Sequence, residues 1–211
     1  MEKSVIVNLT LDEAKELYKS GNEKLRMLAL KIFPEAALDP PSFTQIRSFE
    51  DAMAVLGMNI DDENYTVHTL KVRSKAMAAM YKLNIIRKAL NLNQDLHFTN
   101  DPENSYIYYP YNPIITESST YYEEELKIGK IEIIGKIKSN GVLYNILGVL
   151  ADYVFADSFS DFYSDASVAF LGCASKEIAQ HFGKYFGILI TEAKFGDLDG
   201  FEIIEDKYGN A

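Results

Sequence analysis

The spacing of hydrophobic residues in the first third of the chain predicts a series of helices. The motif Thr10-x-x-Glu13 is a capping box, in which each side chain accepts a hydrogen bond from the other residue's backbone N–H, and it marks a helix start. Asn22 is expected to cap a second helix, and the stretch from Ser48 to Gly57 is expected to form a third. The apolar face of the second helix is expected to consist of Leu25, Leu28, Ala29 and Ile32.

A single long helix is expected from about residue 69 to residue 90. Its apolar positions recur at helical spacing, and most of its basic residues fall outside that stripe. A solvated helix face is the simpler interpretation of this basic stretch, and docking against an acidic partner or a phosphate backbone is the alternative. The apolar stripe is Leu70, Met77, Met80, Tyr81 and Ile85, and the basic residues are Lys71, Arg73, Lys75, Lys82, Arg87 and Lys88.

After residue 93 the pattern changes to that of strands. Residues 106–111 have strand-forming side chains, but Pro110 and Pro113 restrict them to an edge or to a strand end. The pair Asn140-Gly141 predicts a two-residue hairpin turn. With a bulge or close contact at Gly135, the residues expected to face one way are Ile131, Ile133 and Ile137.

The last part of the chain predicts a strand, a helix and a further strand. The strands are expected at residues 167–172 and, at a sheet edge, at residues 201–204. Ser175 is expected to cap the helix, and Gly183 and Gly187 would let that helix lie close to the sheet. The apolar face of the helix is expected to consist of Ile178, Phe182, Tyr185, Phe186 and Leu189.

These elements predict an α+β protein, with a helical N-terminal region followed by a mainly antiparallel sheet packed by a C-terminal helix. The expected division is a helical hairpin over residues 1–40, a helical region over residues 41–95, and a sheet with its helix over residues 96–211. The second and third parts can form one continuous domain.

Composition and charge restrict the class of protein further. The chain has 211 residues, 47% of them hydrophobic and 25% charged, which is enough to bury a core without disulfides or metals. Its net charge of −10 argues against nucleic-acid binding, because phosphate contacts need clustered Lys and Arg. The single cysteine suits a reducing compartment. With no apolar signal peptide and no membrane-length apolar run, we expect a soluble intracellular protein without membrane contact.

No motif in the sequence indicates catalysis, a cofactor or a metal site. His68, His97 and His181 are far apart and none has a metal-ligand spacing. Cys173 precedes a helix start, where a thiol pKa is lowered, but a nucleophile also needs a base, and a small packing residue is the simpler interpretation. The acidic stretch 196–202 lacks the ligand spacing of a calcium loop, and no phosphate-binding glycine motif follows a strand. We therefore expect a non-enzymatic protein without a cofactor.

The tyrosine-rich stretch is the main candidate for a binding surface. In a strand, Tyr106 and Tyr108 share one face and Tyr109 and Tyr111 share the other, and paired tyrosines offer a partner flat apolar rings with polar tips. The alternative is that one face packs into the core and the other shields a sheet edge. The basic residues available to complete a site for an anionic ligand are Arg73, Arg87 and Lys184.

Several stretches of the chain share structural motifs with a known family. They are NLTLDEAKELYKSGNEKLRMLALKIFPEAAL and SFEDAMAVLG in the N-terminal part, and IIRKALNLN, YIYYPY and VAFLGCASKEIAQHFGKYFGILI in the C-terminal part. Together they resemble an uncharacterised family encoded by phages and prophages of gut Bacteroidetes, over most of the chain. The resemblance implies a viral or mobile-element origin, with the protein in the cytoplasm of an infected bacterium or in the virion, and it implies no activity.

Two hypotheses of function follow, from different classes. The leading one is a non-enzymatic phage protein that works through protein–protein contacts, by self-association or with a partner, either inside the particle or on a host factor. The alternative is a small-molecule binder that sequesters an anionic host metabolite or signalling nucleotide. That alternative requires a pocket in which basic and aromatic groups converge.

Overall fold

The computed structural model describes residues 9–39, 42–92, 108–149 and 171–211. Within them, helices come first along the chain, the strands form one antiparallel sheet, and a long helix returns to pack on that sheet. This arrangement confirms the predicted α+β class. The helices are α1 (Leu11–Lys19), α2 (Glu23–Ile32), α3 (Glu35–Leu38), the 3-10 helix η1 (Phe43–Gln45), α4 (Phe49–Leu56), α5 (Ile60–Arg73), α6 (Lys75–Leu90), α7 (Glu123–Lys127) and α9 (Lys176–Phe195), and the strands are β1 (Ile114–Thr116), β2 (Ile131–Ser139), β3 (Val142–Val149) and β4 (Glu202–Asp206).

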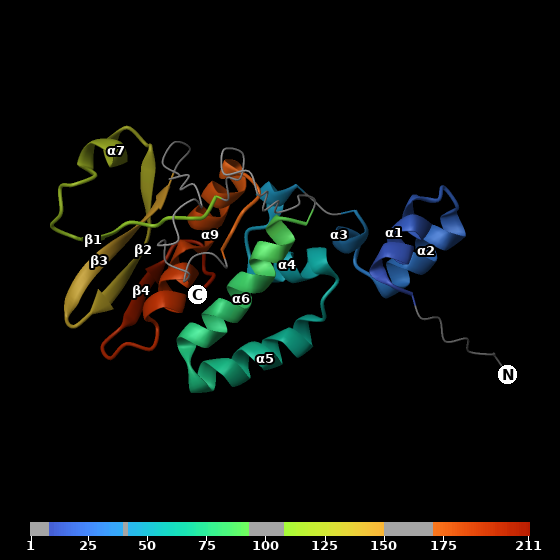
Figure 1. Cartoon of the computed structure of the whole chain (residues 1–211), viewed down its shortest axis with the longest axis horizontal. Helices are drawn as coiled ribbons and strands as arrows, with labels where there is room; N and C mark the ends of the chain where they lie inside the picture. The colour runs from blue at the N-terminus through green and yellow to red at the C-terminus, as the bar shows by residue number, and fades with distance from the viewer. Residues whose placement is uncertain (1–8, 40–41, 93–107, 150–170) are drawn as a thin grey trace, which may run out of the picture.

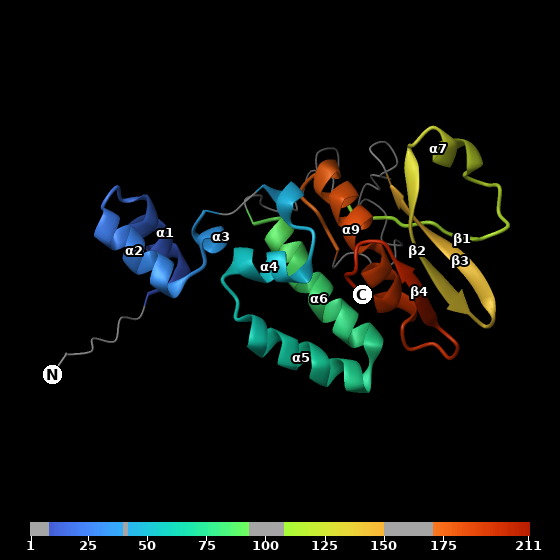
Figure 2. The same cartoon turned by 180° about the vertical axis from the view of Figure 1, so that it is seen from behind.

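The elements are arranged from one end of the molecule to the other (Figures 1 and 2). Helices α1 and α2 lie at one end and the sheet lies at the other, with α4, α5, α6 and α9 between them. The α1–α2 hairpin has a small core of its own around Ala14, Ala29 and Leu38. The short α3 connects this hairpin to α4.

Helices α1, α2, α4 and α9 begin at the capping residues that the sequence predicted. Thr10 and Ser48 each form a capping box with the acidic residue three positions further on. Asn22 and Ser175 accept backbone N–H groups at the starts of α2 and α9. One inner-face residue is misplaced, because Ile32 is 43% exposed.

The prediction of one helix over residues 69–90 is wrong. The chain forms two helices there, because Ser74 adopts an extended conformation (φ −163°, ψ 121°) that ends α5 and begins α6. Ser74 caps α6 by accepting the N–H of Met77, and its own hydroxyl donates to the carboxylate of Asp197. Helix α5 therefore folds back along α6 (Figure 1), and Met77 and Met80, assigned to the apolar stripe, are 54% and 44% exposed.

The sheet has the strand order β1-β3-β2-β4, and all neighbouring strands are antiparallel. Strands β2 and β3 are joined by the predicted Asn140-Gly141 turn, whose φ angles of 49° and 82° are both positive. A shift in register between Ile133 and Gly135 confirms a bulge there, but not its expected consequence. The extra residue places Ile137 in the core under α9 and leaves Ile133 on the opposite face, so the three isoleucines do not face one way.

The tyrosine-rich stretch forms less strand than the sequence predicts. Tyr106 lies outside the described residues, and Tyr108 makes only an isolated bridge to Cys173. The edge strand is instead β1, which begins directly after Pro113, because proline has no N–H for a ladder. Of the strand expected at residues 167–172, only the last two residues are described, and they are not in a strand.

Helix α9 connects the helical half of the molecule to the sheet. On one side it shares a core with α4 and α6, in which Phe182 is fully buried. On the other side it packs on the sheet through Ile188, which meets Ile134 and other strand residues. Gly187 permits this close approach, as predicted, because a β-carbon there would lie 2.4 Å from Ile134 Cδ1.

Candidate functional site

Basic and aromatic side chains from separate segments meet beside α9. Lys184 and Tyr185 come from α9, Lys207 and Tyr208 follow β4, and Arg47 lies between η1 and α4. We call these five residues the Tyr185–Tyr208 cluster. Because Arg47 is far from the other four in sequence, only the fold brings them together.

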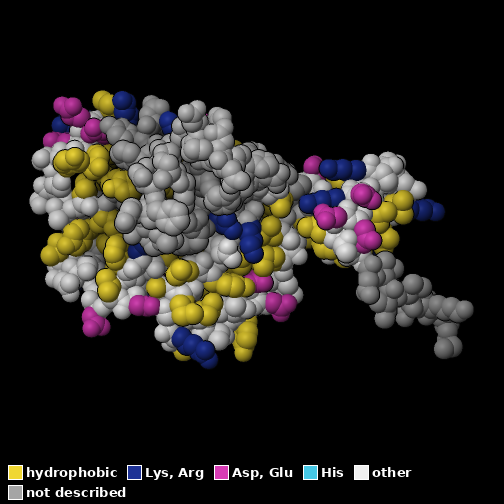
Figure 3. Space-filling view, viewed as in Figure 1, with side chains coloured by type: hydrophobic (Ala, Val, Ile, Leu, Met, Phe, Trp, Pro, Cys, Tyr) yellow, Lys and Arg dark blue, Asp and Glu magenta, His cyan; other side chains and the backbone are white. Residues whose placement is uncertain are grey.

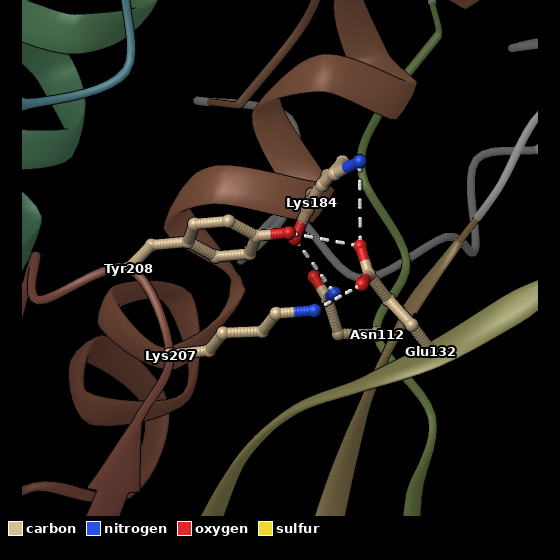
Figure 4. A network of polar contacts seen from close by, with 6 residues as sticks. Asn112, Glu132, Lys184, Lys207 and Tyr208 are labelled. Carbon is tan, nitrogen blue, oxygen red and sulfur yellow. Dashed lines mark hydrogen bonds and ion pairs between the residues drawn. The ribbon is translucent and has the colours of Figure 1, made fainter.

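Glu132 of β2 is the acidic partner of this cluster (Figure 4). Tyr208 donates its hydroxyl to Glu132 Oε1 at 2.9 Å, Lys184 Nζ lies 3.4 Å from the same oxygen, and Lys207 Nζ bonds Oε2. Burial would raise the pKa of Glu132, but the hydrogen bonds from Lys207 and Tyr208 and the charge of Lys184 outweigh it and lower that pKa below its ordinary value. Glu132 is therefore ionised at neutral pH. Burial, together with the bond to Glu132, raises the pKa of Tyr208, so its hydroxyl stays protonated as a donor.

The rings of the cluster pack against one another and against the cations. The ring centroids of Tyr185 and Tyr208 are 4.7 Å apart. Arg47 Cζ lies 5.3 Å from the centre of the Tyr185 ring, and Lys207 Nζ lies 5.5 Å from that of Tyr208. Both distances are within the roughly 6 Å over which a cation is attracted to an aromatic face. His181 extends the row of rings, with its centroid 4.6 Å from that of Tyr185.

Hydrogen bonds to the backbone hold the cluster in place. Asn210 is buried, and its side-chain amide donates to the carbonyls of Arg47 at 3.0 Å and Tyr185 at 2.9 Å. The Asp206 carboxylate accepts the N–H groups of Tyr208, Asn210 and the residue after it, which fixes the turn following β4. The rings are therefore ordered before a partner arrives, and little conformational freedom is lost on binding.

The charged ends of the cluster are accessible to solvent. The side chains of Lys184 and Lys207 are 31% and 48% exposed, and that of Glu132 is 21% exposed. The cluster contains three cations, of which Lys184 and Lys207 share the carboxylate of Glu132 while Arg47 is exposed, and the Asp206 carboxylate nearby is occupied by its own turn. On a chain with a net charge of −10, this is a surface that attracts an anionic group and offers rings for packing.

The described tyrosines of the predicted binding stretch differ in their burial. Tyr108 packs against the core shared by α4, α6 and α9, and it exchanges backbone hydrogen bonds of 3.2 and 2.7 Å with Cys173. Tyr109 is half-buried and Tyr111 is 46% exposed. Tyr106 lies outside the described residues. The position of Tyr108 matches the alternative in which one face of this stretch packs into the core.

The predicted basic residues lie in different places. Arg73 ends α5 and Arg87 lies in the last turn of α6, so at roughly 1.5 Å of rise per residue the length of α6 holds them about 20 Å apart. Lys184 alone belongs to the Tyr185–Tyr208 cluster. The sequence signal for that cluster was the spacing of His181, Lys184 and Tyr185, which share one side of α9.

The candidate nucleophile Cys173 is accounted for by packing. Cys173 is buried, its Sγ lies 3.3 Å from the carbonyl of Leu171, and burial raises the pKa of its thiol although the charge of Arg87 opposes this. In the part of the chain that the structure describes, no group of three or more His, Cys, Asp or Glu side chains is placed to hold a metal ion. Nor is any helix in those residues long and apolar enough to cross a membrane.

Comparison with protein families, with curated proteins and with solved structures finds no match to this chain. Its function is therefore inferred from its own side chains, among which the Tyr185–Tyr208 cluster has the most specific chemistry.

Proposed function

We propose that this protein is not an enzyme and that it acts through contacts with other proteins, with the Tyr185–Tyr208 cluster as its binding surface. The observation that carries this proposal is the convergence of Arg47, Lys184 and Lys207 on two adjacent tyrosine rings. Arginine and tyrosine dominate the energetically important positions of protein interfaces, because they combine apolar contact area with polar ends.

The proposed partner is an acidic segment of another protein. The net charge of −10 disfavours an acidic segment where cations are not gathered, whereas Arg47, Lys184 and Lys207 attract such a segment to the cluster. Nucleic acid is disfavoured as the partner, because it presents a long row of phosphates to a protein of net charge −10. The resemblance to phage and prophage proteins makes the virion or a host factor in the cytoplasm of an infected bacterium the source we propose for that segment.

A small anionic molecule is the second candidate for the same surface. Two tilted rings 4.7 Å apart, with a guanidinium and ammonium groups beside them, also match a phosphate attached to a planar base. The molecule would be an anionic metabolite or a signalling nucleotide. It is distinguished from a protein partner by the experiment below, because a small molecule produces no crosslinked adduct of higher protein mass.

A photo-reactive amino acid at position 44 tests the proposal in cells that produce the protein. Thr44 is exposed, and its carbonyl accepts a hydrogen bond of 3.2 Å from Arg47 Nε, so the crosslinker lies beside the cluster. We expect a discrete adduct with another protein that is lost when Arg47 and Lys207 are both changed to Gln. The matched control changes the exposed residues Lys71 and Lys75 to Gln, which alters the net charge equally. An adduct that survives the first pair of changes, or is lost equally with the second, contradicts the proposal.

A further inference from the structure

Among the described residues, β1 is the last strand on one side of the sheet, and no other strand pairs with its outer edge. The carbonyl of Pro113 accepts a hydrogen bond from β3, and the N–H of Glu117 donates one to β3. Backbone groups alternate in direction along a strand, so those of Ile115, midway between Pro113 and Glu117, also point toward β3. The N–H and C=O of Ile114 and the N–H of Thr116 therefore point outward, and within the described part of the chain they have no hydrogen-bond partner. The carbonyl of Thr116 is used by the N–H of Ser119.

An apolar cavity of about 200 Å³ lies beside this edge. Its exposed walls are Ile114 and Leu198, which are 37% and 57% exposed, and Figure 3 shows hydrophobic side chains on the surface at the sheet end of the molecule. Small-molecule pockets usually measure roughly 300–1,000 Å³, so this cavity suits one apolar side chain better than a whole ligand. It is lined by Ile114, Ile137, Ser139, Tyr144, Phe195, Leu198 and Phe201.

The register of the sheet aims an added strand at this cavity. Residues directly opposite each other in an antiparallel pair place their side chains on the same face. Ile114 is opposite Ile146, which belongs to the core under α9, so the Ile114 side chain lies on the α9 face. A residue that exchanged both of its backbone hydrogen bonds with Ile114 would place its own side chain on that face, at the cavity.

Carboxylates lie in the turn beside the cavity and on the helix that follows β1. Asp199 lies in the turn that contributes Leu198 to the cavity, and Glu124 and Glu125 lie on α7, which follows β1 at the same end of the molecule (Figure 1). Within the described residues none of these three carboxylates makes an ion pair. Basic side chains on an incoming strand would complement them.

We infer that β1 is a docking site for an extended segment of a partner protein. The segment adds to β1 as an antiparallel strand, inserts one apolar side chain into the cavity, and carries lysine or arginine two residues away on either side. Main-chain hydrogen bonds supply affinity and the cavity supplies specificity in this mode of recognition. The site is separate from the Tyr185–Tyr208 cluster, so either one can fail without the other.

The test uses the intact protein and the capped peptide Lys-Thr-Leu-Thr-Lys, followed by ¹⁵N NMR. Three hydrogen bonds and one buried side chain predict weak binding, with a dissociation constant of about 1 mM. We expect the amide signals of Ile114 and Thr116 to shift most, and their hydrogen exchange to slow as the peptide is added. A peptide with N-methylated leucine, which cannot donate to the Ile114 carbonyl, is expected to bind about tenfold more weakly.

Two variants of the protein distinguish the contribution of the cavity from that of the backbone hydrogen bonds. Leu198→Ser removes an exposed wall of the cavity without altering a buried residue, and it is expected to lower the affinity for the peptide about fivefold. Arg47→Gln, in the Tyr185–Tyr208 cluster, is the control and leaves this binding unchanged. The inference is overturned if the parent peptide does not shift Ile114 and Thr116, if the N-methylated peptide binds equally well, or if Leu198→Ser has no effect.

Discussion

Changing Glu132 to Gln tests whether the Tyr185–Tyr208 cluster is organised around a carboxylate. The substitution keeps the shape of the side chain and an acceptor for the Tyr208 hydroxyl, but it removes the charge that Lys184 and Lys207 share. We expect the variant to fold and to be less stable than the original chain.

The size of the loss follows from the contacts. Each ion pair of a partly exposed carboxylate is worth roughly 0.2–1 kcal/mol, and a hydrogen bond to a neutral acceptor is weaker than one to a charged acceptor by about 0.5–1 kcal/mol. A neutral amide costs less to bury than a carboxylate, which offsets part of the loss. The free energy of unfolding should therefore fall by about 1–2 kcal/mol.

The effect should depend on pH with a definite sign. The folded-state pKa of Glu132 lies below its ordinary value of 4.5, so its stabilising contribution is present above that pH and is lost as pH falls through the lower folded value. The difference in unfolding free energy between the two proteins is thus constant near neutral pH and narrows below about pH 4.5.

Urea unfolding followed by circular dichroism measures this difference, with the slope of the transition expected to stay unchanged. Glu117→Gln is the matched control, because that carboxylate is 42% exposed and, within the described part of the chain, has one ion pair, to Lys136 at 3.0 Å. A loss for Glu132→Gln no larger than the loss for Glu117→Gln, or one that does not change with pH, would refute the reasoning.

Three other changes test the packing around the site. Gly187→Ala is expected to destabilise the protein by about 1–3 kcal/mol, because the new β-carbon would lie 2.4 Å from Ile134 Cδ1, whereas Gly183→Ala, with its nearest contact at 3.2 Å, should cost less; equal urea midpoints would contradict this. Asn210→Ala removes two hydrogen bonds to carbonyls of separate segments and should lower the unfolding free energy by about 1–3 kcal/mol in the same assay; an unchanged midpoint would mean that Asn210 does not hold these segments. Because burial raises the pKa of the Cys173 thiol, it should react with a thiol reagent only as fast as the protein opens, and rapid labelling of the folded protein would argue against its burial.

Structural signals that depend on near neighbours in sequence were predictable. A helix cap needs residues three positions apart, and a tight hairpin needs two residues with positive φ. The starts at Thr10, Ser48 and Ser175 and the turn at Asn140-Gly141 are of this kind. The α+β class followed because these signals separate a helical half from a strand-rich half.

Features that depend on distant residues were not predictable. No glycine or proline marks the break at Ser74, which is stabilised by Asp197, 123 positions away in sequence. The bulge at Gly135 was expected, but its effect on side-chain direction depended on Ile134 being the extra residue of the pairing.

The candidate site was predictable only in part, for the same reason. Lys184 was a candidate from sequence, whereas Arg47 and Tyr208 were not, because hydrophobic periodicity does not say which polar faces meet. The segments are joined by Asn210, whose carbonyl partners lie 163 and 25 positions away in sequence. The tyrosine content predicted a binding surface in the stretch around Tyr108, whereas the ring of Tyr108 packs against the core.

The most direct test of the cluster as an interface is the affinity of a fluorescein-labelled glutamate-rich peptide containing one tyrosine, measured by anisotropy at low and high salt. The unchanged protein should bind it, Glu132→Gln should bind it several-fold more tightly despite being less stable, and the double change of Arg47 and Lys207 to Gln should bind it at least tenfold more weakly. The control with Lys71 and Lys75 changed to Gln should match the unchanged protein. Equal affinities for all four proteins, or equal losses for the two double variants, would contradict an acidic partner at the Tyr185–Tyr208 cluster.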